Sequence, residues 1–291
     1  MTLDLKALLA TQGFLILPSI LPATQIASLR SACTTVRSLA ERGQWPHLRT
    51  LPKQFPPWSS DPSHGIWGIQ HLLHPDMPHQ PLFAASYFHD AIIHTVTQLL
   101  DDCSEDDLVM ELYNLLIRPR ADFALRWHRD DIPPSASVDE EEERLLREPA
   151  WHAQWNLALY DDRSLVVVPG SHRRARTERE READAYEMDM PGQLVVELKA
   201  GDAVFYDNNI LHRGIYDCNT ERATLHGSIG HVAGGNVRAR NVLQHGTAEW
   251  VERCRFDGLE KGQRQRAEMM REKLVEMGRL EGGKAGFSQE D

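Results

Sequence analysis

One histidine precedes two aspartates in the segment RWHRDDIPP, residues 126–134. The tract before it is rich in leucine, β-branched and aromatic residues, so residues 109–132 are predicted to form a strand, a short turn and a second strand that carries His128. Side chains alternate faces along a strand, which places His128 and Asp130 on one face and Asp131 on the other. If a metal binds here, we expect Asp130 to be its ligand and Asp131 to be a solvated or structural carboxylate.

A mononuclear iron(II) site needs a second histidine beside this pair, which leaves three coordination positions open. Among the later histidines, His212 stands out because it follows a predicted strand in NNILHRG, and His172 in PGSH is a weaker candidate. Arg222 lies ten residues beyond His212, at the start of the next predicted strand. Antiparallel pairing of those two strands would place a guanidinium near the metal. This arrangement suits a dicarboxylate such as 2-oxoglutarate, which would chelate iron at one end and form a bidentate ion pair at the other.

Each of these features is weak when it stands alone. An HxD pair is common on protein surfaces, a single histidine is more often structural, and a single arginine more often forms a surface ion pair. The order HxD, then mainly β sequence, then histidine and arginine is much more specific. No HExxH, P-loop, GxSxG or GxGxxG motif competes with it.

Composition excludes several other classes of protein. The chain has 291 residues and a net charge of −11, which disfavours general attraction to nucleic acid or to an anionic membrane. We find no apolar run long enough to span a bilayer and no signal-peptide pattern. The four cysteines are far apart and form no CxxC pair, as expected for reduced thiols. We therefore expect a cytoplasmic monomer or homodimer that acts on a small molecule.

The remaining pattern predicts many short strands between helices at the two ends of the chain. Helices are expected at residues 22–42, 81–102 and 258–283, and single strands at 13–18, 155–160, 164–172 and 222–232. Residues 193–216 are expected to form two strands with a turn at 200–202. Two charge-rich segments, 135–149 and 173–185, are expected to be solvated helices, the first with a possible role as a lid. The final residues are expected to be a disordered tail. This order favours a mainly β fold, a sandwich or jelly roll flanked by α-helices, over a doubly wound α/β fold.

Six segments resemble the phytanoyl-CoA dioxygenase family of iron(II)- and 2-oxoglutarate-dependent oxygenases. They are TQGFLILPSILPATQIASLR, IRPRADFALRWHRDD, QWNLALYDD, SLVVVPGSH, KAGDAVFYDNNILHRG and ERATLHGSIG. The resemblance implies one domain over residues 1–291, with a double-stranded β-helix (cupin-like) core at about 10–235 and a C-terminal helical extension at 250–283.

The resemblance also assigns roles to residues. It makes His128, Asp130 and His212 the iron ligands and Arg222 the 2-oxoglutarate anchor. Trp155 would line the co-substrate pocket, Asn114 would touch the co-substrate, and Thr224 could add a hydroxyl contact. The chain departs from the family pattern in the short YDDRS turn, in a slightly short loop after His212, and in Glu111, which replaces a common pocket glutamine.

Several outcomes stay open at this point. The chain is expected to use Fe(II), 2-oxoglutarate and O2, most simply to hydroxylate a small molecule with release of succinate and CO2. The same centre could instead catalyse desaturation, ring formation or isomerisation in natural-product biosynthesis, or the protein could be a non-catalytic cupin-like binding protein. Halogenation is disfavoured because Asp130 fills the position that halide would need. Arginines near the ligands, Arg126 among them, could bind an anionic substrate or could be solvated.

Overall fold

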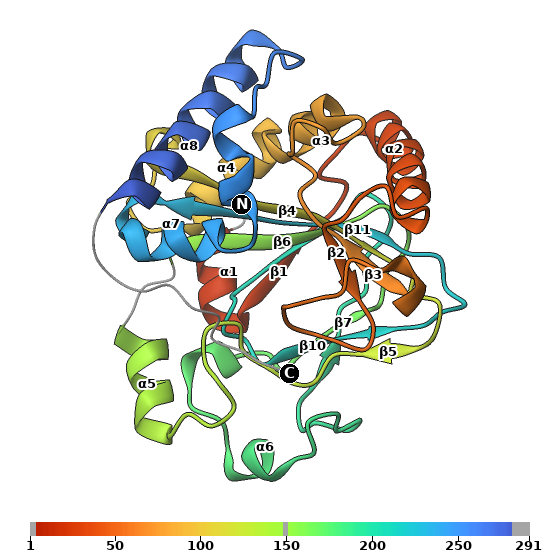
Figure 1. Ribbon diagram of the computed structural model, residues 1–291. Helices are drawn as coiled ribbons and strands as arrows, with labels where there is room; N and C mark the ends of the chain where they lie inside the picture. Colours follow the sequence, from red (N-terminus) through yellow and green to blue (C-terminus); the bar gives the residue numbers. More distant parts are fainter. Residues whose placement is uncertain (1–3, 148–150, 281–291) are drawn as a thin grey trace.

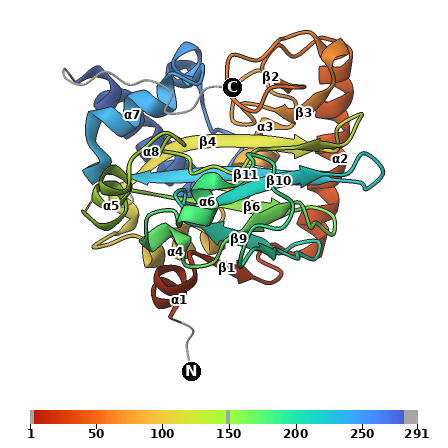
Figure 2. The same ribbon diagram turned by 90° about the horizontal axis from the view of Figure 1, so that it is seen from below.

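Two antiparallel β-sheets face each other in the computed structural model, which describes residues 4–147 and 151–280 (Figures 1 and 2). The larger sheet has seven strands, in spatial order β1 (Phe14–Leu17), β9 (Ala203–Tyr206), β6 (His152–Ala158), β11 (Ala223–His231), β4 (Leu108–Ile117), β3 (Ile66–Ile69) and β2 (Leu48–Thr50). The smaller sheet has four, in the order β5 (Phe123–Ala124), β10 (His212–Tyr216), β7 (Leu165–Val167) and β8 (Leu194–Val195). The predicted mainly β fold, a jelly roll flanked by helices, is confirmed.

Most helices cover the face of the larger sheet that points away from the smaller one, whereas α5 and α6 lie on the side of the smaller sheet (Figure 1). The helices are α1 (Leu5–Gln12), α2 (Ala23–Glu41), α3 (Gln80–Tyr87), α4 (Asp90–Leu99), α5 (Val138–Arg147), α6 (Glu178–Glu182), α7 (Gly235–Leu243) and α8 (Lys261–Arg279). The apolar side chains of α2 at helical spacing, among them Ile26, Leu29, Cys33 and Val36, are buried as their period predicts. They join α3, α4, α8 and the outer face of the sheet in one hydrophobic core.

Most elements predicted in the first half of the chain are present, although α1 and β2 were not expected and two predicted elements are altered. The helix expected over 81–102 is divided into α3 and α4, because His89 adopts an extended backbone and its side chain accepts the N–H of Ala91. Such a side-chain cap starts a new helix. The strand GFLILP and the helix 22–42 appear as β1 and α2.

The second strand expected within 109–132 is much shorter than predicted. Only β5 is regular there, and His128 forms an isolated antiparallel bridge with His212. The segment that carries the candidate ligands is thus extended but irregular.

The two charge-rich segments are helical, but neither is simply solvated. Glu141 of α5 is fully buried and forms ion pairs with Arg176 and Arg181. Glu180 of α6 is also buried and forms a two-pronged ion pair with Arg174, 2.6 Å at each contact. The described part of α5 is largely exposed, as expected of a solvated helix, but its one buried carboxylate anchors it to three guanidinium groups, those of Arg129, Arg176 and Arg181.

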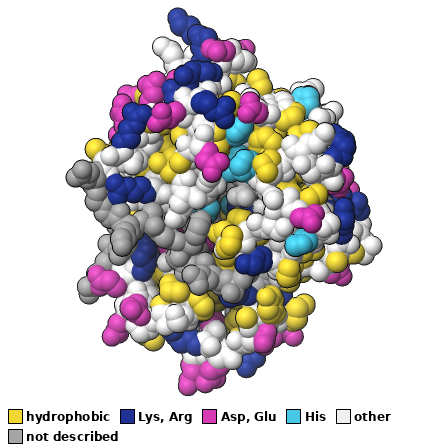
Figure 3. Space-filling model, in the orientation of Figure 1, with side chains coloured by type: hydrophobic (Ala, Val, Ile, Leu, Met, Phe, Trp, Pro, Cys, Tyr) yellow, Lys and Arg dark blue, Asp and Glu magenta, His cyan; other side chains and the backbone are white. Residues whose placement is uncertain are grey.

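One face of the molecule shows how its surface is divided (Figure 3). Side chains of both charges gather over α8, whereas apolar and histidine side chains lie toward the middle of this face. Among the described residues, no helix combines the length and the apolar character that crossing a bilayer requires. The expected disordered tail lies outside the described residues.

Candidate metal centre and active site

Two imidazoles meet where the irregular ligand segment runs beside the start of β10. The backbone N–H of His128 donates to the carbonyl of His212, and the N–H of His212 donates to the carbonyl of His128, both at 3.0 Å. This bridge leaves the two ring centroids 4.3 Å apart. Two residues further on, the N–H of Asp130 donates to the carbonyl of Asn208 at 2.9 Å, which keeps the aspartate beside the histidines.

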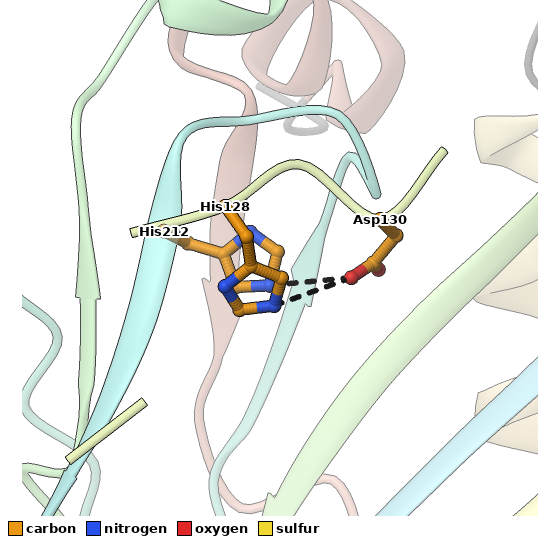
Figure 4. Close-up of side chains that lie close together, drawn as sticks. All are labelled: His128, Asp130 and His212. Carbon is orange, nitrogen blue, oxygen red and sulfur yellow. Dashed lines mark ion pairs between the residues drawn. The ribbon is translucent and has the colours of Figure 1, made fainter. Parts of the chain in front are cut away.

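The carboxylate of Asp130 faces both rings (Figure 4). Its Oδ1 lies 3.5 Å from Nε2 of His128 and 3.7 Å from Nε2 of His212. The side chain of Asp131 points elsewhere and forms an ion pair with Arg144 at 2.8 Å. The structure thus places Asp130 on the histidine side and Asp131 on the other, as strand alternation suggests.

Backbone carbonyls fix the tautomer of both histidines. Nδ1–H of His128 donates to the carbonyl of Arg126 at 2.9 Å, and Nδ1–H of His212 donates to that of Ile210 at 2.8 Å. A carbonyl can only accept, so each Nδ1 carries the proton and each Nε2 presents a lone pair toward Asp130. Burial, together with the neighbouring His212, holds the pKa of His128 well below its usual 6.5, so this ring is neutral and able to bind a metal.

The donor set fits a mononuclear metal ion. One atom each from His128, Asp130 and His212 lies within 4.8 Å of the other two. Bonds of about 2.0–2.2 Å from each of these atoms to one ion would form after the three side chains move slightly closer together. Two imidazoles and one carboxylate on one side of an ion form the facial triad of non-haem iron(II) oxygenases. These residues therefore fit iron(II).

Gln154 was not singled out from the sequence, although it holds the metal-facing carboxylate in place. Its Nε2 donates to Oδ2 of Asp130 at 3.0 Å, which leaves Oδ1 to face the histidines. Burial raises the pKa of Asp130, an effect that His212 opposes. The signal that could have revealed Gln154 is the alternation His152, Gln154, Asn156: three polar residues on one face of a strand whose other residues are apolar.

A cavity of about 220 Å³ lies between the two sheets and includes the three candidate ligands and Arg222 in its wall. The larger sheet contributes Gln154, Asn156 and His226, and the smaller sheet contributes His212 and Tyr216. The expectation that the strands of His212 and Arg222 pair with each other is wrong: β10 pairs with β5 and β7, and β11 pairs with β4 and β6. The two residues belong to opposite sheets and face a shared cavity.

Arg222 presents an unused donor to this cavity. Its Nε donates to Oδ2 of Asp162 at 2.8 Å, and its guanidinium lies 4.3 Å from the ring centre of Tyr216. Its Nη1 is buried and has no hydrogen-bond partner among the described residues. Burial lowers the pKa of Arg222, but the attraction of Asp162 and Tyr216 outweighs it, so the side chain stays charged. A buried, orphaned cationic donor is a site for an anionic ligand.

Asp162 is the second functional residue missed from the sequence. It also accepts from Oγ1 of Thr224 at 3.0 Å and from Oγ of Ser164 at 2.7 Å. The hydroxyl of Thr224 therefore contacts Asp162, the partner of Arg222, and Thr224 is not among the residues that line the cavity, so the expected co-substrate contact is replaced by one to Asp162. Asp162 is the second aspartate of YDDRS, so the turn noted as short supplies the carboxylate that orients Arg222.

Two of the expected co-substrate residues do not line the cavity. Trp155 is fully buried on the opposite face of β6, where it packs against Tyr87 and Phe205. Asn114 is buried too, and its Oδ1 accepts the backbone N–H of His71 at 3.1 Å. The structure therefore corrects the expectation for both: strand alternation turns Trp155 into the core, and Asn114 supports a loop.

Glu111 forms a buried ion pair with Arg238 of α7, in which Nε of Arg238 donates at 2.7 Å. Burial raises the pKa of Glu111, but the charge of Arg238 outweighs it and the net pKa is lowered. The glutamate is therefore ionised and paired, and α7 forms part of the cavity wall through Arg238.

Comparison with known proteins agrees with this geometry. The family model for phytanoyl-CoA dioxygenase (PhyH) matches residues 9–215, so the chain belongs to the phytanoyl-CoA dioxygenase family. Fold and site together define the protein as an iron(II)- and 2-oxoglutarate-dependent oxygenase. No curated protein sequence matches the chain.

Three solved structures illustrate the shared fold. AviO1 from Streptomyces viridochromogenes Tue57 is 16% identical, with 79% of this chain and 96% of that chain covered and a TM-score of 0.55. EctD from S. alaskensis, with 2-oxoglutarate and 5-hydroxyectoine, is 17% identical, with 81% and 78% covered and a TM-score of 0.55. HygX from Streptomyces hygroscopicus, with nickel and 2-oxoglutarate, is 17% identical, with 79% and 87% covered and a TM-score of 0.54. At identities this low, the structural similarity establishes a shared fold and no more.

Proposed function

We propose that this protein is a dioxygenase that hydroxylates a small molecule with Fe(II), 2-oxoglutarate and O2. In the overall reaction, one oxygen atom enters a C–H bond of the substrate as hydroxyl. The other oxidises 2-oxoglutarate, which loses CO2 and becomes succinate. Atoms and electrons balance without a further reductant.

The observation that carries the proposal is the convergence of the two anchors on one cavity. The Nε2 lone pairs of His128 and His212 and the Oδ1 of Asp130 face a common point, and Arg222 offers a buried donor in the same wall. A dicarboxylate held by Arg222 at one end could reach the metal with the other. HygX and EctD, which have the same fold, have been solved with 2-oxoglutarate bound.

The residues of the chain have separable roles in this proposal. His128, Asp130 and His212 hold iron, Gln154 orients the carboxylate, and Arg222 binds the far carboxylate of 2-oxoglutarate. When bound, iron with 2-oxoglutarate and O2 supplies the oxidising chemistry. Burial of the site between two sheets limits the access of water to it.

Succinate release tests the function directly. Protein supplied with Fe(II), 2-oxoglutarate and O2 should form succinate, and a screen of small molecules should identify a substrate that accelerates it and gains one oxygen atom. Arg222→Met should retain metal but weaken 2-oxoglutarate binding by about 30-fold to several thousand-fold, the size expected for an unpaired buried charge. Unchanged dependence on 2-oxoglutarate in Arg222→Met would refute the anchor, and absence of metal-dependent succinate in the wild type would refute the proposed function.

A further inference from the structure

A second arginine, Arg49, lines the same cavity without a charged partner. It comes from β2 and lies in the wall together with the three candidate metal ligands and Arg222. Among the described residues, its side chain has no ion pair or hydrogen bond, and its Nε is buried without a partner. The residue is half-buried, and within the described parts of the chain only its Nε is enclosed without a partner. The rest of its guanidinium can face the cavity with no carboxylate of the described residues bound to it, which makes it a site for an anionic ligand.

The other charged groups of the cavity wall differ from Arg49 in this respect. In the described parts of the chain, Arg222 pairs with Asp162, and Arg238 pairs with Glu111. Asp131 pairs with Arg144, and Asp130 faces the histidines. Burial lowers the pKa of Arg49 and outweighs the attraction of Tyr216, Tyr206 and Asp130, none of which forms an ion pair with it. The pKa values of Arg222 and Arg238 are raised instead, because their carboxylate partners outweigh burial.

The surrounding backbone is built to accommodate this side chain. Arg49 lies directly opposite Gly68 in the pairing of β2 with β3. A Cβ atom at residue 68 would lie 2.9 Å from Cδ of Arg49 and 3.1 Å from its Cβ. Because residue 68 is glycine, the aliphatic part of the Arg49 side chain can lie directly over the neighbouring strand β3.

Two tryptophans flank the guanidinium. Its Cζ lies 5.2 Å from the ring centre of Trp58 and 5.4 Å from that of Trp67. These aromatic faces hold the group by cation–π attraction and leave its hydrogen-bonding edge for a ligand. Phe55, which also lines the cavity, lies edge-on to His128 at 5.6 Å between ring centres, so this aromatic wall extends to the metal centre.

We propose that Arg49 binds an anionic group, a carboxylate in the simplest case, of the primary substrate, with Trp58 and Trp67 packing against the part of the substrate that carries it. This inference rests on the proposed function, because 2-oxoglutarate already has a partner for each carboxylate: the metal at one end and Arg222 at the other. Arg49 is therefore a specificity-determining residue that selects acidic substrates and orients them toward the metal.

Binding of benzoate and of its neutral analogue benzamide tests the inference without knowledge of the substrate. Calorimetry is performed on protein loaded with nickel(II) and 2-oxoglutarate. The wild type should prefer benzoate by about tenfold or more, as expected for a charge-assisted contact. Arg49→Met should lose this preference, and Arg49→Lys should keep part of it. The affinity for 2-oxoglutarate should change by less than about threefold in both variants, since the proposed contacts of 2-oxoglutarate with the metal and Arg222 remain. Arg163→Met is the matched control, because Arg163 is exposed and pairs with Glu197 on the surface.

Three results would separate the possible failures. Equal binding of benzoate and benzamide by the wild type would overturn the inference, even if Arg49→Met failed to fold. A loss of 2-oxoglutarate affinity in Arg49→Met as large as in Arg222→Met would place Arg49 in the co-substrate site, which overturns the inference and leaves the proposed function standing. Failure of the wild type to bind nickel and 2-oxoglutarate would refute the proposed function itself, whereas a benzoate preference in metal-free protein would still support the anion site.

Discussion

At the scale of single residues, the site depends on groups that act through their partners. Arg222 is oriented by Asp162, and Asp130 is oriented by Gln154. Neither partner belongs to the motif that reveals the site in the sequence. The order of HxD, histidine and arginine along the chain is what predicts the site. The supporting contacts of Asp162 and Gln154 form between segments far apart in the sequence, so that order does not reveal them.

Asp162 gives a prediction about stability and pH. Burial raises its pKa, but Arg222 and Ser164 outweigh this, so its folded pKa is lower than its ordinary value. An aspartate whose pKa is lower in the folded protein than in the unfolded chain stabilises the fold at pH values above its unfolded-state pKa of about 3.9. This contribution is lost as the pH falls through the folded-state pKa. Asp162→Asn should therefore cost about 3–5 kcal/mol at pH 7, because it breaks a buried ion pair, and the cost should shrink below about pH 4.

Urea unfolding of wild type and variant at several pH values measures this difference. Asp161→Asn is the neighbouring control, since Asp161 is exposed and pairs with Lys199 on the surface. A cost for Asp162→Asn that stayed constant down to pH 3, or an equal cost for Asp161→Asn, would contradict the assignment.

At the scale of elements, α5 is held to the body of the protein by its own buried charge. Glu141 pairs with Arg176 and Arg181, and Arg144 reaches Asp131, the residue after the candidate ligand. We expect Glu141→Ala to free α5, because three guanidinium groups, those of Arg129, Arg176 and Arg181, then lose their shared partner. Hydrogen exchange of residues 138–147 should accelerate by about tenfold or more.

The neighbouring exposed residue provides the control for that experiment. Glu142→Ala changes the charge of α5 by the same amount but removes no buried contact, so exchange should stay near the wild-type rate. If α5 works as a lid over the site, Glu141→Ala should also release succinate without oxidised product. Tight coupling in a variant whose α5 exchanges rapidly would show that α5 is not the lid.

The comparison of predicted and observed elements shows what local sequence can determine. The apolar period of α2, and runs of apolar and β-branched residues between turn signals, were sufficient to place that helix and most strands, because such residues are buried. The break at His89 and the irregular segment around His128 were not predictable, since a side-chain cap and a bridge to His212 decide them. Trp155 was misplaced because a resemblance assigns a position but does not determine which face of a strand a side chain occupies.

At the scale of the whole molecule, the C-terminal helices belong to the same core as the sheets. Met270 and Leu274 of α8 are fully buried in the cluster that also includes Leu29 of α2 and Leu225 of β11. We therefore propose a single domain that unfolds as one unit. Helix ellipticity and tryptophan fluorescence should report the same urea midpoint. Separate midpoints would show that the helical extension folds independently.

The ligand set is the central claim, and anaerobic titration with Fe(II) in the presence of 2-oxoglutarate tests it most directly. Wild type should bind one Fe(II) per chain and develop the visible charge-transfer band of chelated 2-oxoglutarate. Asp131→Ala should do the same, because Asp131 faces Arg144 and Asn208, whereas Asp130→Ala should lose the band. Retention of iron and band in Asp130→Ala together with their loss in Asp131→Ala would contradict the account.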